Sequence, residues 1–564
     1  MKLIRENILL LVIILIGIAL RLWGIDFGLP QLFHQDEPII VNHALAYGTG
    51  DLNPHFFIVP PFTSYILFFF YGIYFLLLNL LGVLKGTEAF AISFFRDPTP
   101  FYLIGRFLIG LLPSIFNIYL VYKLALKFFS KNAALYSALI MALSFLNVIN
   151  GHYIYTDNLL VMFVLLSYIS IANIIKNPTR LNYLLVALLS GIAIATKYNA
   201  AILVVPLLIA HTIVAKEDKR KLFSTNLFIF AGVMVLAFVI CNPYSVLDWR
   251  FFLLTLTGRI RASYIGWSHH IRYSLFEGLG IFPTLLGITG LFLVLFKRFK
   301  EALFILSFPL IFYMHLALKS QHFARYGLVL IPFLSVGAGF LLFDYLYPKL
   351  RSKMKQSVLL AVSIIIIIPT ASKSIKADLL FSRPDTREEA KAWIEQNLPA
   401  SSKIAFGDTS FTLQLKQTEA QLRRKKDIIG RQPELKELKA RKLDLRLKAL
   451  GDEKAYEVYY LVEGGETEGQ FFNMWPIIRN NLDEIREERI KYIVFNNMTG
   501  SESMRRFHEK IAKIYKPIAE FSPYENENFR RPYDTIATTC IPIRSKELFS
   551  RRKNGPYIRI YRIR

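Results

Sequence analysis

The sequence predicts a multi-spanning α-helical membrane protein of about eleven crossings, with juxtamembrane helices and a C-terminal soluble α/β domain. The chain has 564 residues and is 54% hydrophobic, which is too apolar for a soluble protein of this size. Its apolar runs reach the length that spans a bilayer, and nearly all of them precede residue 375. We therefore expect a membrane domain over residues 1–375 and a soluble domain over residues 376–564.

The first apolar run, residues 8–20, predicts a membrane helix that starts in the cytoplasm. Lys2 and Arg5 precede it, and positive charge stays on the cytoplasmic side. No small-residue cleavage site follows Leu22, so a removed signal peptide is disfavoured. The acidic pair Asp36 and Glu37 should therefore emerge on the far side of the membrane.

The next apolar segment, residues 62–84, is long enough to cross, but the charge pattern argues against it. A crossing there would place Lys123, Lys127 and Lys131 outside, against the positive-inside rule. We expect this segment to lie along the outer face as juxtamembrane helices. The later spans then alternate, and their odd total leaves the C-terminal domain outside: 102–127, 133–149, 158–175, 182–196, 199–214, 225–241, 276–296, 302–318, 326–343 and 357–372.

The C-terminal part alternates between helical and strand patterns, which predicts an α/β module. Thr386 to Glu389 has the pattern of a capping box. Strands are expected at 402–406, 456–462, 492–495 and 556–561, with a helix near 502–514. This part has no Gly-rich phosphate loop and no metal motif. The basic run at 423–426 predicts a solvated face; contact with an anionic lipid or polymer is the weaker alternative.

Charge and cysteine content exclude several classes of protein. The net charge is +25, but in the membrane half the basic residues sit in short loops, which indicates topology and not nucleic-acid binding. Cys241 and Cys540 are the only cysteines, so neither a disulfide framework nor a cysteine metal site is predicted.

The predicted topology gathers unusual polar residues on one face of the membrane. They are Asp36, Glu37, His152, Asp157, Lys197, the loop 242–273 and the segment from Lys319 to Arg325. Each has a structural explanation: Asp157 as a helix N-cap, Lys197 as a snorkelling side chain, Arg325 as an interfacial anchor. Their convergence on one side predicts a functional site.

The order of these motifs resembles the GT-C glycosyltransferases that use lipid-phosphate sugar donors. An acidic pair follows the first helix, then come Gly105-Arg106-Phe107, the run from His152 to Asn158, Thr196-Lys197-Tyr198, and Arg325-Tyr326 before Pro332. The pattern is most similar to protein O-mannosyltransferases and bacterial lipid A aminoarabinose transferases. The soluble tail, at 386–404 and 555–563, also looks like the module attached to many bacterial members.

The resemblance implies inverting transfer of a sugar from a polyprenyl phosphate to a hydroxyl of a lipid, protein or polysaccharide, outside the cytoplasmic (plasma) membrane. Asp36 matches the family's base, Glu37 would orient substrate, and Asp157 matches the second acid. Arg325 and Lys197 are the leading cations for the lipid phosphate. Further candidates for substrate binding are Arg259, Arg261, Lys319, His152, Tyr198 and Tyr326.

One stretch departs from the aminoarabinose transferases, which carry a Glu-Lys pair before a proline in the first outer loop. Residues 55–60 have neither an acid nor a lysine. This disfavours an aminoarabinose donor, and no ligand spacing supports a divalent cation, although His34 or His55 would be the candidates for one.

Two other functions compete with transfer of a single lipid-linked sugar. A transporter or lipid flippase would bury charges near the middle of the bilayer and show paired halves, and no internal repeat is visible. A polysaccharide ligase or polymerase would carry a large outer loop and no acidic pair after the first helix.

Overall fold

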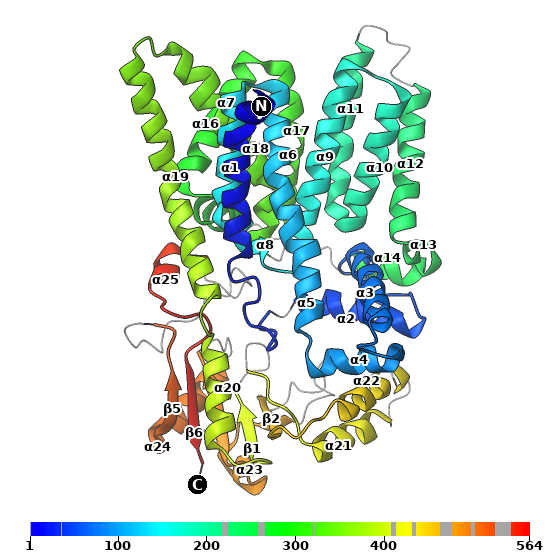
Figure 1. The fold of residues 1–564 in the computed structure, drawn as a ribbon, viewed down its shortest axis with the longest axis vertical. Coiled ribbons are helices and arrows are strands. Elements are labelled where there is room, and N and C mark those ends of the chain that lie inside the picture. Colours follow the sequence, from blue (N-terminus) through cyan, green and yellow to red (C-terminus); the bar gives the residue numbers. More distant parts are fainter. Residues whose placement is uncertain are drawn as a thin grey trace.

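The computed structural model describes residues 2–34, 36–216, 224–257, 266–319, 322–407, 413–430, 436–462, 477–497, 502–524 and 543–563. Figure 1 shows a bundle of long helices at one end and a sheet flanked by helices at the other. Shorter helices lie between the two parts.

The bundle consists of long, mostly apolar helices, several of which expose large hydrophobic side chains. They are α1 (Lys2–Leu22), α6 (Leu112–Phe128), α7 (Lys131–Leu143), α9 (Thr156–Lys176), α10 (Arg180–Thr196), α11 (Val204–Ala215), α12 (Thr225–Cys241), α16 (Ile281–Lys297), α17 (Phe299–Ala317), α18 (Ile331–Gly339) and α19 (Lys353–Phe381). Within the described residues, seven helices are long and apolar enough to cross a membrane, or up to nine if each of two bent pairs is one span. These helices indicate an integral membrane protein, and the expected total of eleven crossings stays a prediction.

Short helical turns extend or join the long helices. They are α5 (Thr99–Gly105), η2 (Arg106–Leu111), α8 (Phe145–Gly151), η3 (Tyr198–Leu203), α15 (Gly266–His269), η5 (His270–Glu277), η6 (Ala324–Leu330), η7 (Phe340–Leu346) and η8 (Tyr347–Lys349). Close approach inside the bundle depends on small residues. A side chain on Gly290 of α16 would collide with the carbonyl oxygen of Gly337 on α18.

Helix α3 (Phe62–Leu80) lies at the end of the bundle that faces the sheet. It packs on α2 (Glu37–Ala46), and Figure 1 draws it near α4 (Gly86–Arg96) and α14 (Trp249–Thr257), below the long helices. The short elements η1 (Tyr47–Thr49) and α13 (Tyr244–Leu247) complete this layer. By length and composition α3 is one of the seven candidate spans among the described residues, so the expectation that residues 62–84 do not cross stays a prediction.

The C-terminal part forms a six-stranded sheet of order β3-β2-β1-β4-β6-β5. The strands are β1 (Lys403–Phe406), β2 (Glu457–Val462), β3 (Ile477–Arg479), β4 (Tyr492–Asn496), β5 (Pro517–Phe521) and β6 (Ile558–Arg562). β3, β2, β1 and β4 run parallel, while β6 is antiparallel to both of its neighbours. Strands are therefore present at all four expected places, and β3 and β5 are additions.

Helices cover both faces of this sheet, as parallel strands require. One face packs on α20 (Thr386–Asn397). The other packs on α23 (Leu482–Glu487) and α24 (Glu502–Ile514). The hairpin of α21 (Glu419–Gly430) and α22 (Lys436–Lys448) contacts α4, and α25 (Ser545–Phe549) contacts α19. Through α4 and α19 the sheet domain, residues 386–563, touches the helical part.

Side-specific labelling of introduced cysteines tests the position of α3. We expect Lys85→Cys, after α3, to be labelled from the same side as Asp452→Cys in the sheet domain, because both lie at the sheet end of the molecule. Asn177→Cys, after α9, should be labelled from the opposite side. The measurement uses an impermeant maleimide on intact cells, with Cys241 and Cys540 replaced by serine. Labelling of Lys85→Cys together with Asn177→Cys would mean that α3 crosses the membrane.

Candidate active site

Asp36 directly precedes α2, and its carboxylate is partly exposed. It stands at the N-cap position, yet its side chain caps no backbone amide. Its Oδ2 instead accepts a 2.7 Å hydrogen bond from Nη2 of Arg325, and the Asp36 side chain is 31% exposed. The carboxylate is therefore available to another molecule, unlike the acids around it.

Asp157 lies in the first turn of α9 and is almost fully buried. The N-cap of that helix is Tyr155, so Asp157 does not serve as the cap. Its Oδ1 lies 2.6 Å from Nζ of Lys197, and its Oδ2 lies 3.7 Å from Nε of Arg325. Arg325 therefore links the two carboxylates that the sequence places 121 residues apart.

Three cations surround the ring of Tyr326. The charged groups of Lys197, Lys319 and Arg325 lie 4.4, 5.6 and 5.5 Å from its centre. With Asp36 and Asp157 as the acids bonded to them, this group of described residues carries one more positive than negative charge. Burial, and next the charge of Lys197, lower the pKa of Lys319 to about 8 against an opposing effect of Asp157. The group is suited to receive an anion.

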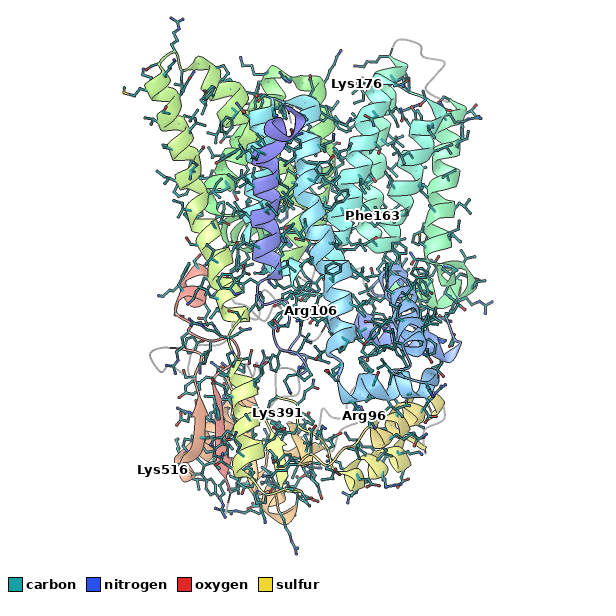
Figure 2. All side chains as sticks on the ribbon, viewed as in Figure 1. Arg96, Arg106, Phe163, Lys176, Lys391 and Lys516 are labelled. Atoms are coloured by element: carbon teal, nitrogen blue, oxygen red, sulfur yellow. The ribbon has the colours of Figure 1, made fainter. Side chains whose placement is uncertain are left out.

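Glu37 points away from this cationic group and into the protein. Its two oxygens accept hydrogen bonds from Nε and Nη2 of Arg106, each at 2.9 Å. The backbone amide of Ile154 donates to the same carboxylate at 3.2 Å. Neither Glu37 nor Arg106 is more than 1% exposed, and Figure 2 shows Arg106 at the sheet end of the bundle. Glu37 was expected to orient substrate, but it has no surface with which to touch one.

Two other predicted binding residues are engaged with the backbone. The imidazole of His152 is fully buried, with Nδ1 and Nε2 each 3.0 Å from a carbonyl oxygen, of Val148 and Trp23. The hydroxyl of Tyr198 donates to the carbonyl of Phe57 at 3.1 Å. Both side chains support neighbouring segments of chain. Arg259 and Arg261 lie outside the described residues.

The structure adds His34 and Tyr155 to the neighbourhood of Asp36. The backbone amide of Asp36 donates to Nδ1 of His34 at 3.1 Å, and the hydroxyl of Tyr155 bonds to Nε2 of the same ring. The Arg325 guanidinium stacks 4.4 Å from the centre of the Tyr155 ring. Tyr155 lies in the run from His152 to Asn158, one of the motifs noted in the sequence, and His34 was considered from the sequence only as a candidate for a divalent cation; no pattern in the sequence predicted their contacts around Asp36.

Among the described residues, no group of three or more His, Cys, Asp or Glu side chains is arranged to hold a metal ion. His34 is occupied as above, and His55 pairs with the exposed Asp51 at 2.9 Å.

A protein-family model matches a segment that contains part of this site. Residues 102–246 match the model described as dolichyl-phosphate-mannose-protein mannosyltransferase. The matched segment includes Arg106, Asp157 and Lys197. The match confirms, for this part of the chain, the resemblance predicted from the motifs.

Solved structures similar to the chain include two membrane transferases. AglB, the archaeal oligosaccharyltransferase from Archaeoglobus fulgidus in complex with an inhibitory peptide and a dolichol-phosphate, is 12% identical, with a TM-score of 0.47 over 94% of this chain and 75% of that one. ArnT from Cupriavidus metallidurans matches in the apo state with 12% identity and a TM-score of 0.48 over 98% and 97% of the two chains. Bound to undecaprenyl phosphate, ArnT matches with 14% identity and a TM-score of 0.49 over 91% and 96%. No curated protein matches the chain. Identities and scores this low assign no role to any residue here.

The buried ion pair between Glu37 and Arg106 predicts that replacing one partner destabilises the protein more than replacing both. We expect Glu37→Gln to lower the free energy of unfolding by about 3–5 kcal/mol, because it leaves the Arg106 charge buried without a counter-charge. Thermal unfolding in detergent measures this. The double variant Glu37→Gln with Arg106→Met is the control, since it removes both charges and should recover part of the loss. A wild-type transition temperature for Glu37→Gln alone would contradict the prediction.

Proposed function

We propose that the protein is an inverting glycosyltransferase. It moves a sugar, a hexose or a pentose, from a polyprenyl-phosphate-linked donor to a hydroxyl group of an acceptor. The observation that carries this proposal is a partly exposed carboxylate, Asp36, beside a cationic group with excess positive charge, Arg325, Lys197 and Lys319. The family match over residues 102–246 supports the class of donor.

The cationic group binds the phosphate of the donor. As the bond between the anomeric carbon and the phosphate oxygen breaks, negative charge develops on that oxygen, and fixed cations stabilise it. Arg325 is suited to this because its planar guanidinium can donate two parallel hydrogen bonds to a phosphate. Lys197 and Lys319, whose charged groups also lie near the Tyr326 ring, add positive charge.

Asp36 accepts the proton of the attacking hydroxyl. The acceptor oxygen forms a bond to the anomeric carbon while the phosphate leaves with the bonding electron pair, and the hydroxyl proton moves to the carboxylate. Attack opposite to the leaving phosphate inverts the anomeric configuration. Asp157 acts by holding Lys197 and Arg325, and Glu37 acts by fixing the start of α2.

The site lies on the extracytoplasmic side of the plasma membrane in this proposal. The positive-inside rule supports that side for the sheet end of the bundle. Nucleotide sugars are absent there, so the activated sugar must arrive on a lipid. A lipid donor also explains why the cationic group lies directly at the helix ends.

Transport is the weaker alternative. A transporter would hold its charged binding groups near the middle of the bilayer. Here Lys197 directly follows α10, and Lys319 lies two residues past α17. Both positions are at helix ends and not at helix centres.

Replacing the base tests the proposal. Asp36→Asn should lower the rate of sugar transfer by about 10²–10⁴-fold, because an amide cannot accept the proton. The assay follows release of sugar from a panel of polyprenyl-phosphate sugars by the purified protein, with a mixture of hydroxyl acceptors present. Asp51→Asn, another acid near α2, is the matched control and should retain wild-type activity. Full activity of Asp36→Asn would exclude Asp36 as the base.

The titration of Lys319 predicts how donor binding depends on pH. Because the pKa of Lys319 is lowered to about 8, this lysine is charged below that pH and loses its charge as the pH rises through it. The donor KM should therefore increase several-fold between about pH 7 and about pH 9, as one cation of the site is neutralised. In Lys319→Arg the guanidinium stays charged, so the increase should disappear. An unchanged pH profile in Lys319→Arg would show that another group titrates.

A further inference from the structure

The segment that leads to Asp36 is held by contacts on several sides. We call residues 23–34 the base loop. Nη1 of Arg106 donates to the carbonyl oxygens of Ile25 and Phe27, each at 2.8 Å. The ring of Phe27 also lies 4.2 Å, between centres, from that of Phe381 at the end of α19. These contacts fix the first half of the base loop to the bundle.

Phe33 closes the second half of the base loop. Its side chain is only 5% exposed and folds back across Gly28. A Cβ at Gly28 would lie 2.6 Å from Cδ2 of Phe33, and Gly28 has a φ of +63°. Only glycine allows both the backbone turn and the close approach of the ring. Asp36 follows Phe33 by three positions in the chain.

The outer face of Phe33 is covered by Arg387, which belongs to the sheet domain. The guanidinium carbon of Arg387 lies 3.7 Å from the centre of the Phe33 ring. Arg387 is 2% exposed, and Asp385 accepts hydrogen bonds from its Nε and Nη2 at 2.8 and 2.7 Å. A cation stacked on a buried ring in this way makes a directional contact. The two hydrogen bonds to Asp385 hold the guanidinium in this orientation.

We propose that Arg387 and Phe33 are positioning residues, through which the sheet domain holds Asp36 at the distance from Arg325 that transfer requires. This inference rests on the proposed function. It gives the sheet domain a part in the chemistry of the membrane site, in addition to any contact with an acceptor.

A second set of contacts supports the segment that carries Arg325, the partner of Asp36. Oε2 of Glu277 in η5 accepts hydrogen bonds from Lys373 of α19 and from the hydroxyl of Ser545 of α25, each at 2.7 Å. In the same η5 turn the hydroxyl of Ser274 donates to the carbonyl of Ala324 at 2.7 Å, next to Arg325. The sheet domain thus reaches both partners of the Asp36–Arg325 ion pair.

The effect should appear in the turnover number and not in donor binding. We expect Phe33→Leu and Arg387→Met each to lower kcat by about ten- to a hundredfold, because small displacements of a catalytic group have effects of that size, while the donor KM stays within about twofold because the cationic group is untouched. The double variant should be no worse than the more impaired single variant. Arg387→Lys should restore part of kcat, since it keeps a cation on the ring.

Hydrogen exchange of the peptide that contains residues 28–37 decides the inference independently of activity. Exchange in full-length protein should be faster in Phe33→Leu and in Arg387→Met, and unchanged in Lys391→Met. Lys391, labelled in Figure 2, is a cation on the same helix α20 that pairs with Glu395. Phe33→Leu leaves α20 intact, so it covers the case in which Arg387→Met fails to fold.

The outcomes separate this inference from the proposed function. Faster exchange together with a lower kcat supports both. Faster exchange in a protein whose wild type transfers no sugar supports the contact and overturns the function. Unchanged exchange in Phe33→Leu, or a rise in donor KM with an unchanged kcat, overturns the positioning role.

Discussion

The buried ion pair between Glu37 and Arg106 determines where the other residues of the site lie. Both charges are removed from water, so they are stable only while they face each other with their remaining hydrogen bonds made. Glu37 also accepts from the amide of Ile154, and Arg106 also holds two carbonyls of the base loop. One pair therefore joins α2, η2, the segment before Asp157 and the segment before Asp36. The partly exposed position of Asp36 follows from the inward position of its neighbour.

The sequence predicted the long helices and named the charged residues that the structure brings together around Tyr326. It did not predict which of these residues contact each other. Apolar runs of bilayer length and lysines in short loops identify the long helices. The inward turn of Glu37 was not predictable, because adjacent residues at a helix start point in different directions and only the fold shows which one meets Arg106. The contact of Asp157 with Lys197 is equally hidden, since it arises from the packing of α9 against α10 and not from any spacing in the chain.

The sheet domain shows a similar limit. The strands with strong apolar character were predictable, whereas β3 has only three residues and β5 begins at a proline and has no buried side chain. The capping box at the start of α20 uses Asp385 and Glu388, one residue earlier than the expected Thr386 and Glu389. Both pairs satisfy the same spacing, and the hydroxyl of Thr386 instead donates to the carbonyl of Pro556 at 2.6 Å. The tertiary contact of Thr386 with Pro556 therefore leaves Asp385 as the residue that caps α20.

The hydrogen bond between Asp36 and Arg325 also bears on what happens before substrate arrives. The carboxylate of Asp36 and the guanidinium of Arg325 form an ion pair, so the proposed base and the proposed phosphate ligand are engaged with each other. In the proposed reaction a donor phosphate competes for the same guanidinium and leaves the carboxylate free to accept a proton. In the proposed reaction the base therefore becomes available only once the donor is bound, and this gives a preferred order in which the lipid binds first and the hydroxyl acceptor second.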